Sequence, residues 1–209
     1  MKGLLLKELF MIRKTWISIT IFIATFGCMG IFGGEPNMML MISIFISIWS
    51  ISFLSFDDVS KWRQYSLTLP YGRKTIVSSK YLAVLLFDII SDVLVLCCYM
   101  ISVCLKIIDF SADELVLLMF LSVVGGVIYP VLTLPLYYRF SSEKARMFIM
   151  VAGGIVGGTS TFFMKLPFMN MDIIINNAEI AMFIILASVV IFFILSWLLS
   201  VKIYEKRDL

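Results

Sequence analysis

The chain contains no histidine among its 209 residues, and this absence removes several kinds of site at once. Catalytic Ser-His and Cys-His pairs, HExxH zinc sites and haem ligation by imidazole all need that side chain. The cysteines do not replace it, because no CxxC pair with zinc spacing occurs among Cys28, Cys97, Cys98 and Cys104. We therefore expect neither catalytic residues nor a metal site in this chain.

A nucleotide-binding loop is also missing, because the chain has no GxxxxGK[ST] pattern. The glycine-rich run at residues 153–158 has no lysine after it and lies within a hydrophobic segment, where a phosphate would not be solvated. We expect no cofactor to be bound by this chain. If ATP and Mg²⁺ power the protein, another polypeptide binds them.

Charged residues are scarce, at 15% of the chain, while hydrophobic residues reach 61% and the mean hydropathy is +1.04. A soluble domain of this size cannot bury so much apolar surface, so we expect the lipid bilayer to be its solvent. A helix needs about 20 mostly apolar residues to cross about 30 Å of hydrocarbon. Six windows meet this requirement: residues 15–32, 37–56, 81–104, 115–137, 147–164 and 180–201. Their unbroken apolar runs favour helices over barrel strands and predict an all-α integral membrane protein with six transmembrane helices in a single domain, 1–209.

Basic residues are divided very unequally between the two sides of the membrane that these spans define. One side carries only Lys106 and Lys165, and the other carries the remaining fifteen of the seventeen Lys and Arg. By the positive-inside rule, both termini and the long connection between spans two and three are cytoplasmic. The net charge of +3 therefore reports orientation, and we expect no nucleic-acid partner.

The segment before the first span has apolar residues at helical spacing on one side, at Leu5, Leu9, Ile12 and Trp16. Lys7 and Lys14 fall on a different side. This pattern predicts an N-terminal interfacial amphipathic helix, with its apolar side in the headgroup layer and its lysines near anionic lipid. The alternative is that the segment only extends the first span into the cytosol.

Residues 57–81 form the only long polar and basic interval in the chain. A short helix in this interval can bring four apolar or aromatic residues onto one face, namely Val59, Trp62, Tyr65 and Leu69. Pro70 and Gly72 then break that helix before the third span. We expect a short amphipathic helix at the membrane surface, available to a soluble partner, and the alternative is a solvated loop that only sets topology.

The residues of this interval resemble the segment after the second span of ABC-2 type transporter permeases. The resemblance is carried by Trp62, Tyr65, Thr68-Leu69-Pro70, Arg73, Ile76-Val77 and Ser79-Lys80-Tyr81, and it is strongest with the compact bacterial subfamily that includes phenol-soluble-modulin exporter permeases. The general plan of that family, with an interfacial N-terminal helix, six spans and cytoplasmic ends, also matches this chain. The resemblance implies a multi-pass protein of a bacterial plasma membrane.

In such transporters a separate cytoplasmic ABC ATPase binds ATP, and a coupling helix between spans two and three carries its motion to the membrane helices. The resemblance implies that Trp62 and Leu69 anchor this coupling helix, with Tyr65 on the same face, while Lys61 and Arg63 meet acidic groups of the ATPase. It implies that Pro70 fixes the turn. It also implies that the third span is held at the headgroups by Arg73, Lys74 and Lys80, and that a second permease subunit, identical or related, helps to enclose the substrate path.

Two aspartates stand out inside the third predicted span. Asp88 and Asp92 are spaced i,i+4, which places them on one helix face, and an aspartate at the centre of a span costs about 3 kcal/mol to insert. Both should therefore face protein or a wet cavity. Three roles remain open: a structural role with Ser and Thr partners, a lining of the translocation path, or a proton relay.

The glycines Gly153, Gly154, Gly157 and Gly158 form two interlocked small-xxx-small pairs, which let helix backbones approach closely in lipid. Whether that contact lies within one subunit or across a dimer is open at this point. The sequence as a whole favours a non-catalytic permease subunit of an ATP-driven exporter of amphipathic peptides, antibiotics or similar compounds. The competing hypothesis is a stand-alone proton- or ion-coupled carrier that uses Asp88 and Asp92.

Overall fold

The computed structural model describes residues 2–12, 15–66, 72–140, 143–145, 147–151 and 178–206. Within these ranges the chain forms helices and no strand. The principal helices are α1 (Lys2–Ile12), α2 (Trp16–Gly33), α3 (Pro36–Val59), α4 (Trp62–Ser66), α5 (Arg73–Cys104), α6 (Ala112–Arg139) and α9 (Ala178–Lys206). The all-α prediction is confirmed for this part of the chain.

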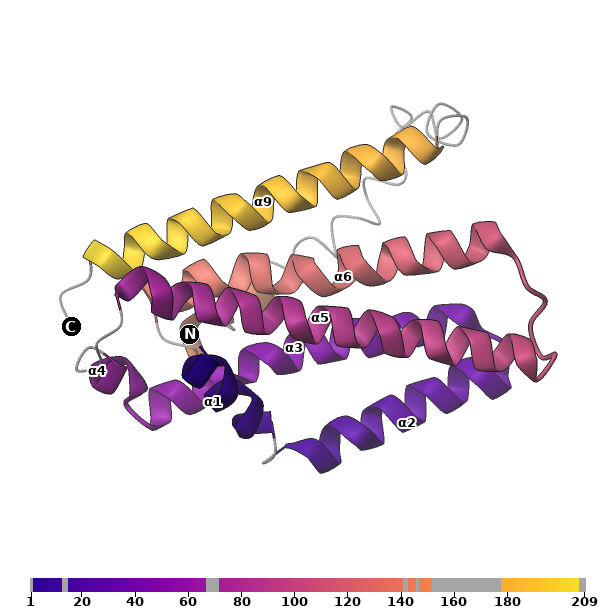
Figure 1. Ribbon diagram of the computed structural model, residues 1–209, viewed down its shortest axis with the longest axis horizontal. Helices are drawn as coiled ribbons and strands as arrows, with labels where there is room; N and C mark the ends of the chain where they lie inside the picture. The colour runs from indigo at the N-terminus through magenta and orange to yellow at the C-terminus, as the bar shows by residue number, and fades with distance from the viewer. Residues whose placement is uncertain are drawn as a thin grey trace.

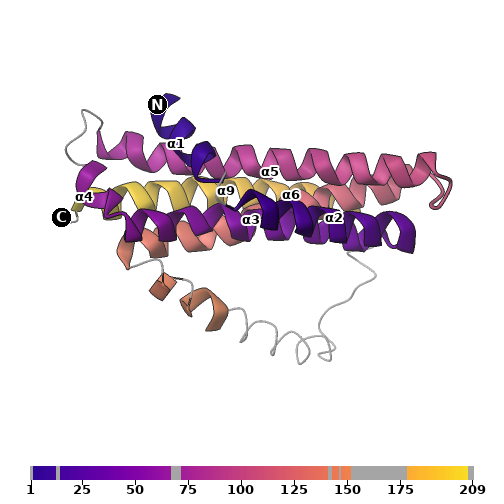
Figure 2. The same ribbon diagram turned by 90° about the horizontal axis from the view of Figure 1, so that it is seen from below.

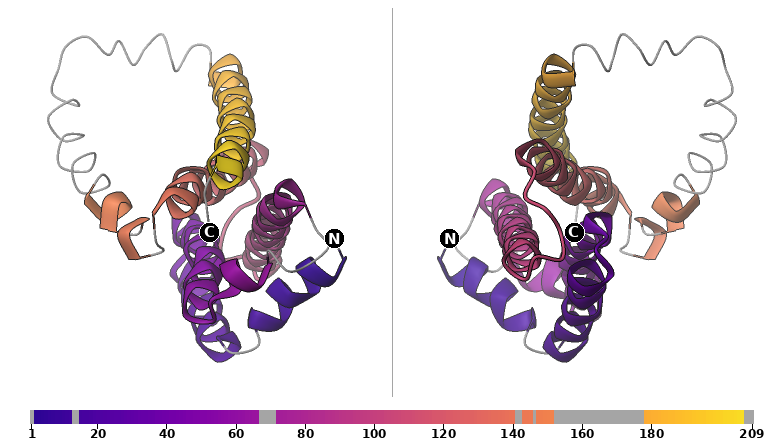
Figure 3. Two further views of the ribbon diagram at one scale, coloured as in Figure 1. Left: turned by 90° about the vertical axis from the view of Figure 1, so that its left-hand side faces the viewer. Right: turned by 90° about the vertical axis from the view of Figure 1, so that its right-hand side faces the viewer.

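The long helices lie side by side as an elongated bundle (Figures 1 and 2). Helix α2 is at one edge and α9 at the opposite edge (Figures 1 and 3). Between them, α3 packs on α2 and α6, and α6 packs on α9. Helix α5 contacts α1, α2, α3, α6 and α9, so it connects both sides of the bundle. The short helices α1 and α4 lie nearer the same end of the bundle, where Figure 1 also shows the last turn of α9.

Five helices of the described chain are long and apolar enough to cross a membrane: α2, α3, α5, α6 and α9. They correspond to five of the six predicted spans. Most of the predicted fifth span, 147–164, lies outside the described residues, which include only a helical stretch at 147–151. A sixth span therefore stays a prediction.

The helices extend beyond the apolar windows from which they were predicted. Helix α5 begins at Arg73 instead of Tyr81, and α9 ends at Lys206 instead of Val201. With 32 residues, α5 is about 48 Å long, well beyond about 30 Å of hydrocarbon. A polar residue ends an apolar window without ending a helix, because backbone hydrogen bonds continue wherever neighbouring elements pack on the extra turns.

Local sequence explains where α2 ends and α3 begins. Gly34 follows α2 with φ of 67°, the left-handed conformation that commonly ends a helix and that suits glycine. Pro36 opens α3 at its first position, where a missing N–H costs nothing. The chain therefore reverses direction within two residues, which lays α2 against α3.

Helix α6 runs through two prolines, and each leaves one backbone carbonyl without its helical donor. Pro130 leaves the carbonyl of Gly126, which accepts a hydrogen bond from the Ser47 hydroxyl on α3. Pro135 leaves the carbonyl of Val131, which accepts one from Ser196 on α9. Such partners are required where no water is present, so these bonds allow α6 to remain helical inside a membrane.

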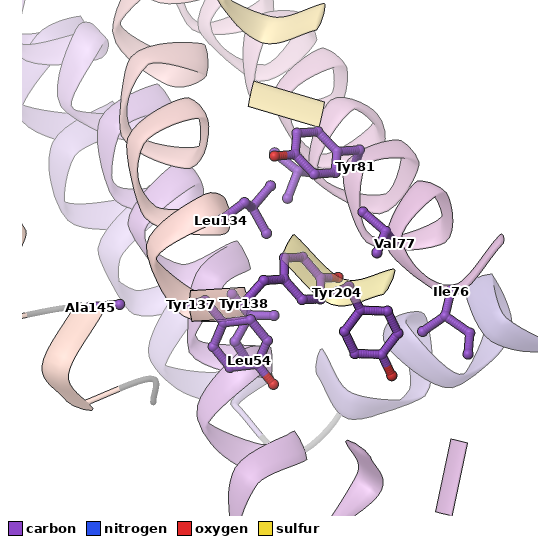
Figure 4. Packing of buried hydrophobic residues seen from close by; sticks show 10 residues of the cluster. Leu54, Ile76, Val77, Tyr81, Leu134, Tyr137, Tyr138, Ala145 and Tyr204 are labelled. Atoms are coloured by element: carbon purple, nitrogen blue, oxygen red, sulfur yellow. The ribbon is translucent and has the colours of Figure 1, made fainter. Parts of the chain in front are cut away.

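Among the described residues, the largest cluster of buried apolar side chains lies where α3, α5, α6 and α9 meet, near the end of the bundle that carries α4. Its centre is aromatic: the rings of Tyr138 and Tyr204 are 5.3 Å apart, as are those of Tyr137 and Tyr138. Figure 4 shows these rings grouped with Tyr81 and Leu134. This packing fixes the ends of four helices relative to one another beside α4.

Candidate functional site

We call the end of the bundle that carries α4 the α4 end. Nearly all basic residues of the described chain belong to segments at this end: Lys2, Lys7, Lys61, Arg63, Arg73, Lys74, Lys80, Arg139, Lys144, Lys202 and Lys206. At the opposite end the described residues include one basic residue, Lys106, beside four exposed acidic ones, Glu35, Asp109, Asp113 and Glu114. The fold therefore keeps the charge asymmetry that the sequence predicts.

Four charged side chains from three helices meet at the α4 end, and we call them the charge cluster: Lys7, Glu8, Asp57 and Lys80. Lys80 of α5 lies 2.7 Å from the Glu8 carboxylate of α1 and also pairs with Asp57 at the end of α3. Lys7 pairs with the other oxygen of Asp57 and lies 3.5 Å from Glu8. Two cations and two carboxylates balance one another, which makes burial of the group tolerable.

The two lysines of the charge cluster differ in their surroundings. The side chain of Lys80 is 7% exposed, whereas that of Lys7 is 18% exposed and borders the outside. Burial, followed by the nearby Lys80 charge, lowers the pKa of Lys7, while Asp57 and Glu8 oppose that change. The charged form of Lys7 is therefore no more favourable with α1 docked on the bundle than it is with Lys7 in water.

Helix α1 forms in the N-terminal segment where a helix was predicted, but the surroundings of Lys7 differ from the prediction. Leu4 and Glu8 are buried against the bundle, and Lys7 points toward Asp57 instead of lipid. Leu6 and Phe10 are exposed. The prediction placed Lys7 near anionic lipid, whereas Asp57 on α3 and Lys80 on α5 hold Lys7 and Glu8 in the charge cluster, because they carry the opposite charges.

Helix α4 is fixed at both of its ends by polar contacts to other helices. At its start, Lys7 Nζ lies 3.9 Å from the centroid of the Trp62 ring. At its end, the buried Ser66 hydroxyl lies 3.2 Å from the hydroxyl of Tyr204 on α9. A five-residue helix is not stable alone, so these contacts determine its direction.

The first turns of α5 are attached to the last turns of α9 by a series of side-chain contacts. Arg73 donates to the backbone carbonyls of Tyr204 and Glu205, at 3.3 and 2.7 Å, where the end of α9 exposes carbonyl oxygens. Further along, Trp197 donates its indole N–H to Ser78 at 3.1 Å. The start of α5 thus joins α9 on one side and the charge cluster on the other.

The predicted coupling residues fall into three groups in the structure. Lys61 and Tyr65 are exposed, as a surface for a partner requires, and Lys74 is exposed with its Nζ 5.2 Å from the ring of Trp197. Trp62 is half-buried under Lys7, and Arg73 binds the end of α9. The backbone of Arg63 is part of α4, whereas its side chain, Leu69 and Pro70 lie outside what the structure describes, as do Gly153, Gly154, Gly157 and Gly158.

One predicted position needs correction. The resemblance implied that Lys80 holds the third span at the headgroups, but its side chain is buried and paired with Glu8 and Asp57. The reason is that α5 starts two turns earlier than predicted, so Lys80 lies inside the bundle and not at its surface. Arg73 and Lys74 occupy the first turn instead.

Asp88 and Asp92 face other helices and not lipid, as the sequence predicts. The Ser122 hydroxyl of α6 donates to Asp92. Asp88 is 5% exposed and lies between Ser43 of α3 and Gly126 of α6, and its Oδ1 has no hydrogen-bond partner among the described residues. The two carboxyls therefore lie in a polar seam between α3, α5 and α6.

Glu8, Asp57 and Tyr204 belong to the site but were not predicted from the sequence. Glu8 is the only acidic residue in an N-terminal segment that otherwise carries lysines, and Asp57 ends an apolar span. Isolated acids at the edges of spans that also carry lysines were the available signal, since a buried charge needs a partner. Tyr204 carried no signal, because its role depends on where α9 ends beside α4.

A family model described as ABC-2 family transporter protein matches residues 3–205, a range that includes α4, the charge cluster and the five long helices except the last residue of α9. A search of curated proteins and a search of solved structures each find no match.

Proposed function

Because this chain belongs to the ABC-2 transporter family, as a multi-pass membrane permease, we propose that it is the membrane-spanning subunit of an exporter driven by a separate ABC ATPase. The observation that carries the proposal is the attachment of α4 at both ends, to Lys7 at its start and to Tyr204 at its end. Because α4 is fixed at both ends, a displacement of α4 by a partner also displaces the helices to which it is attached.

The exposed side of the α4 end fits a protein partner with acidic and apolar groups. Val59 is 85% exposed at the end of α3, and Tyr65 is 57% exposed on α4, with the exposed Lys61 between them. An aromatic ring and an aliphatic side chain beside a cation are typical of an interface core with a charged rim. We infer that these three residues contact the ATPase, with Arg63 of α4 as a further cation toward its acidic groups.

The contacts of α5 give the route from α4 into the membrane. A displacement of α4 reaches α9 through Ser66 and Tyr204, and it reaches α1 and α3 through Trp62, Lys7 and Asp57. Arg73 and Lys80, near the start of α5, join these two routes. Movement at α4 is therefore shared by α3, α5 and α9, all of which are long enough to span the membrane.

The remaining parts of the proposal rest on the family and on charge. We infer a bacterial plasma membrane with the α4 end and both termini in the cytoplasm, since the basic residues collect there. ATP and Mg²⁺ are bound by the ATPase, and this chain supplies no catalytic residue. Two permease subunits enclose the path of an amphipathic peptide, an antibiotic or a similar membrane-active compound.

Capture of the ATPase tests this function. Cysteine in place of Lys61, in a chain whose native cysteines are replaced, should crosslink to a co-purified protein that hydrolyses ATP, and the permease should change that hydrolysis rate. Cysteine in place of Lys106, at the opposite end, is the matched control and should give no crosslink. A chain that exports its cargo without any ATPase would contradict the proposal.

A stand-alone proton- or ion-coupled carrier is the second candidate, and one observation favours it. The Oδ1 of Asp88 is buried without a hydrogen-bond partner among the described residues, a state that a bound proton would relieve. Asp88→Asn and Asp92→Asn separate a structural role of these aspartates from a functional one. Export that survives both substitutions leaves Asp88 and Asp92 a structural role, and export that stops while the ATPase still binds and hydrolyses ATP points to the carrier or to a lining of the path.

A further inference from the structure

Lys7 lies where three helices come within reach of a single ammonium group. It belongs to α1, it pairs with Asp57 of α3, and its Nζ lies 3.9 Å from the centroid of the Trp62 ring of α4. Trp presents the best ring face for a cation, and attraction of this kind is strongest where water is partly excluded. Lys7 is thus placed to orient the first residue of α4.

We propose that Lys7 is a positioning residue for α4, so that α1 is a working part of the coupling device and not only an anchor on the membrane. The proposal rests on the proposed function for the meaning of coupling, but the position of α4 is measurable without it. Through Lys7, α4 is tied to the same Asp57 that pairs with Lys80 of α5. A change in the angle of α4 therefore alters how α1 and α5 share Asp57.

The surroundings of Lys7 argue that it acts on position more than on folding. When Lys7 is removed, Asp57 and Glu8 keep Lys80, which lies 2.7 Å from Glu8 and also pairs with Asp57. Lys7 is the more exposed lysine of the pair, and its pKa is lowered on docking, so its charge adds little to the stability of the fold. The Trp62 ring, in contrast, loses the cation that contacts its face.

A distance measurement in the full-length chain tests this directly. Spin labels on cysteines in place of Tyr65 on α4 and Arg139 on α6, with the four native cysteines replaced, report the position of α4 within the bundle. We expect Lys7→Met to broaden or shift the distance distribution and Lys7→Arg to restore it, because Arg also binds ring faces. Phe10→Ala, an exposed change one turn along α1, is the matched control and should leave the distribution unchanged.

A second variant distinguishes loss of the Lys7–Trp62 contact from misfolding. Trp62→Leu keeps an apolar side chain but removes the ring, so it should give the same change as Lys7→Met, and the double variant should add nothing further. An unaltered distribution in Lys7→Met, or equal additive effects in the double variant, would overturn the proposal. Loss of thermal stability with unchanged distances would overturn it too, since this is the result of a purely structural role.

The functional arm uses the assembled transporter. Lys7→Met should reduce the stimulation of ATP hydrolysis by cargo about threefold to tenfold, the range of one cation–ring contact, while the ATPase still co-purifies. Lys7→Arg should recover most of that stimulation. If no ATPase binds the unaltered chain, the proposed function fails while the distance measurement still decides the role of Lys7.

Discussion

Ser196 on α9 donates a hydrogen bond to the backbone carbonyl of Val131 on α6, with 2.7 Å between the two oxygens. That carbonyl has no helical donor because Pro135 lacks an N–H four residues later. The Ser196 oxygen in turn lies 2.8 Å from the Tyr81 hydroxyl of α5, which lies 2.7 Å from Ser200. Since Ser196 donates its proton to Val131, Tyr81 donates to Ser196 and Ser200 donates to Tyr81. One proline in α6 thus organises a hydrogen-bonded contact of three helices.

We expect Ser196→Ala to destabilise the protein by about 1 to 2 kcal/mol, because a buried carbonyl is left without a donor. In a Pro135→Ala background the same substitution should cost less, because the introduced alanine supplies the backbone N–H that the Val131 carbonyl needs. Thermal unfolding of the purified variants in detergent measures both effects. Ser188→Ala, on the exposed side of α9, is the control. Equal losses in the two backgrounds would show that Pro135 and the Ser196 bond are unrelated.

Two adjacent glycines of α6 provide a matched pair for testing the seam around Asp88. A Cβ on Gly126 would overlap the Asp88 carboxyl group and lie 2.8 Å from Ser43 Oγ. A Cβ on Gly125 would meet Ile44 at 3.5 Å, an ordinary contact. We therefore expect Gly126→Ala to cost about 1 to 3 kcal/mol through overpacking and Gly125→Ala to cost little.

Folded yield after detergent extraction, with thermal unfolding of the material recovered, distinguishes the two glycines. Asp88→Ala should rescue Gly126→Ala, since it removes the group that the new methyl meets. Failure of this rescue would mean that the backbone approach of α3 and α6 at Ser43, not the aspartate, sets the need for glycine.

The geometry of the charge cluster predicts that removing Lys80 destabilises the protein more than removing Lys7 does. Lys80→Met leaves Glu8 and Asp57 buried with only Lys7, and loss of one partner of a buried pair typically costs about 3 to 5 kcal/mol. Lys7→Met should cost far less, because Lys7 is the more exposed lysine and Lys80 still pairs with both carboxylates. Lys74→Met, exposed on the same helix as Lys80, should have little effect.

Thermal unfolding in detergent orders these variants, and Glu8→Gln added to Lys80→Met should recover part of the loss by restoring a balanced pair of Lys7 and Asp57. Equal stability of the Lys80 and Lys7 variants would contradict the geometry of the cluster.

The short helix and the two aspartates could be predicted from the sequence because they depend on local patterns. Trp62 and Tyr65 were expected in a short helix because of their spacing, and the structure has α4 there. Val59, which was expected on the same short helix, belongs to α3, and Lys61 lies between the two helices. Asp88 and Asp92 were expected to face protein because lipid does not solvate a carboxylate, and they do. The start of α5 was misplaced because hydropathy marks the edge of the bilayer and not the end of a helix.

The connections within the site were not visible, because each joins residues far apart in the chain. Lys7 and Asp57 are fifty positions apart, and Ser66 and Tyr204 are 138 positions apart. Spacing along one helix says which residues share a face, but it does not say which face meets which neighbour. For α1 the spacing placed Lys7 near anionic lipid, whereas Lys7 pairs with Asp57.

By itself the amino-acid sequence determined the solvent, the helical class, the unequal placement of charge and the family of this protein, because those properties are sums over residues or short patterns. Only the tertiary structure decided that Lys80 is buried, that Lys7 reaches Trp62, and that serines on α3 and α9 satisfy the carbonyls freed by prolines in α6. In a bilayer a buried polar group has no water to bind, so its partner is fixed by how the helices pack, and packing is a property of several helices together.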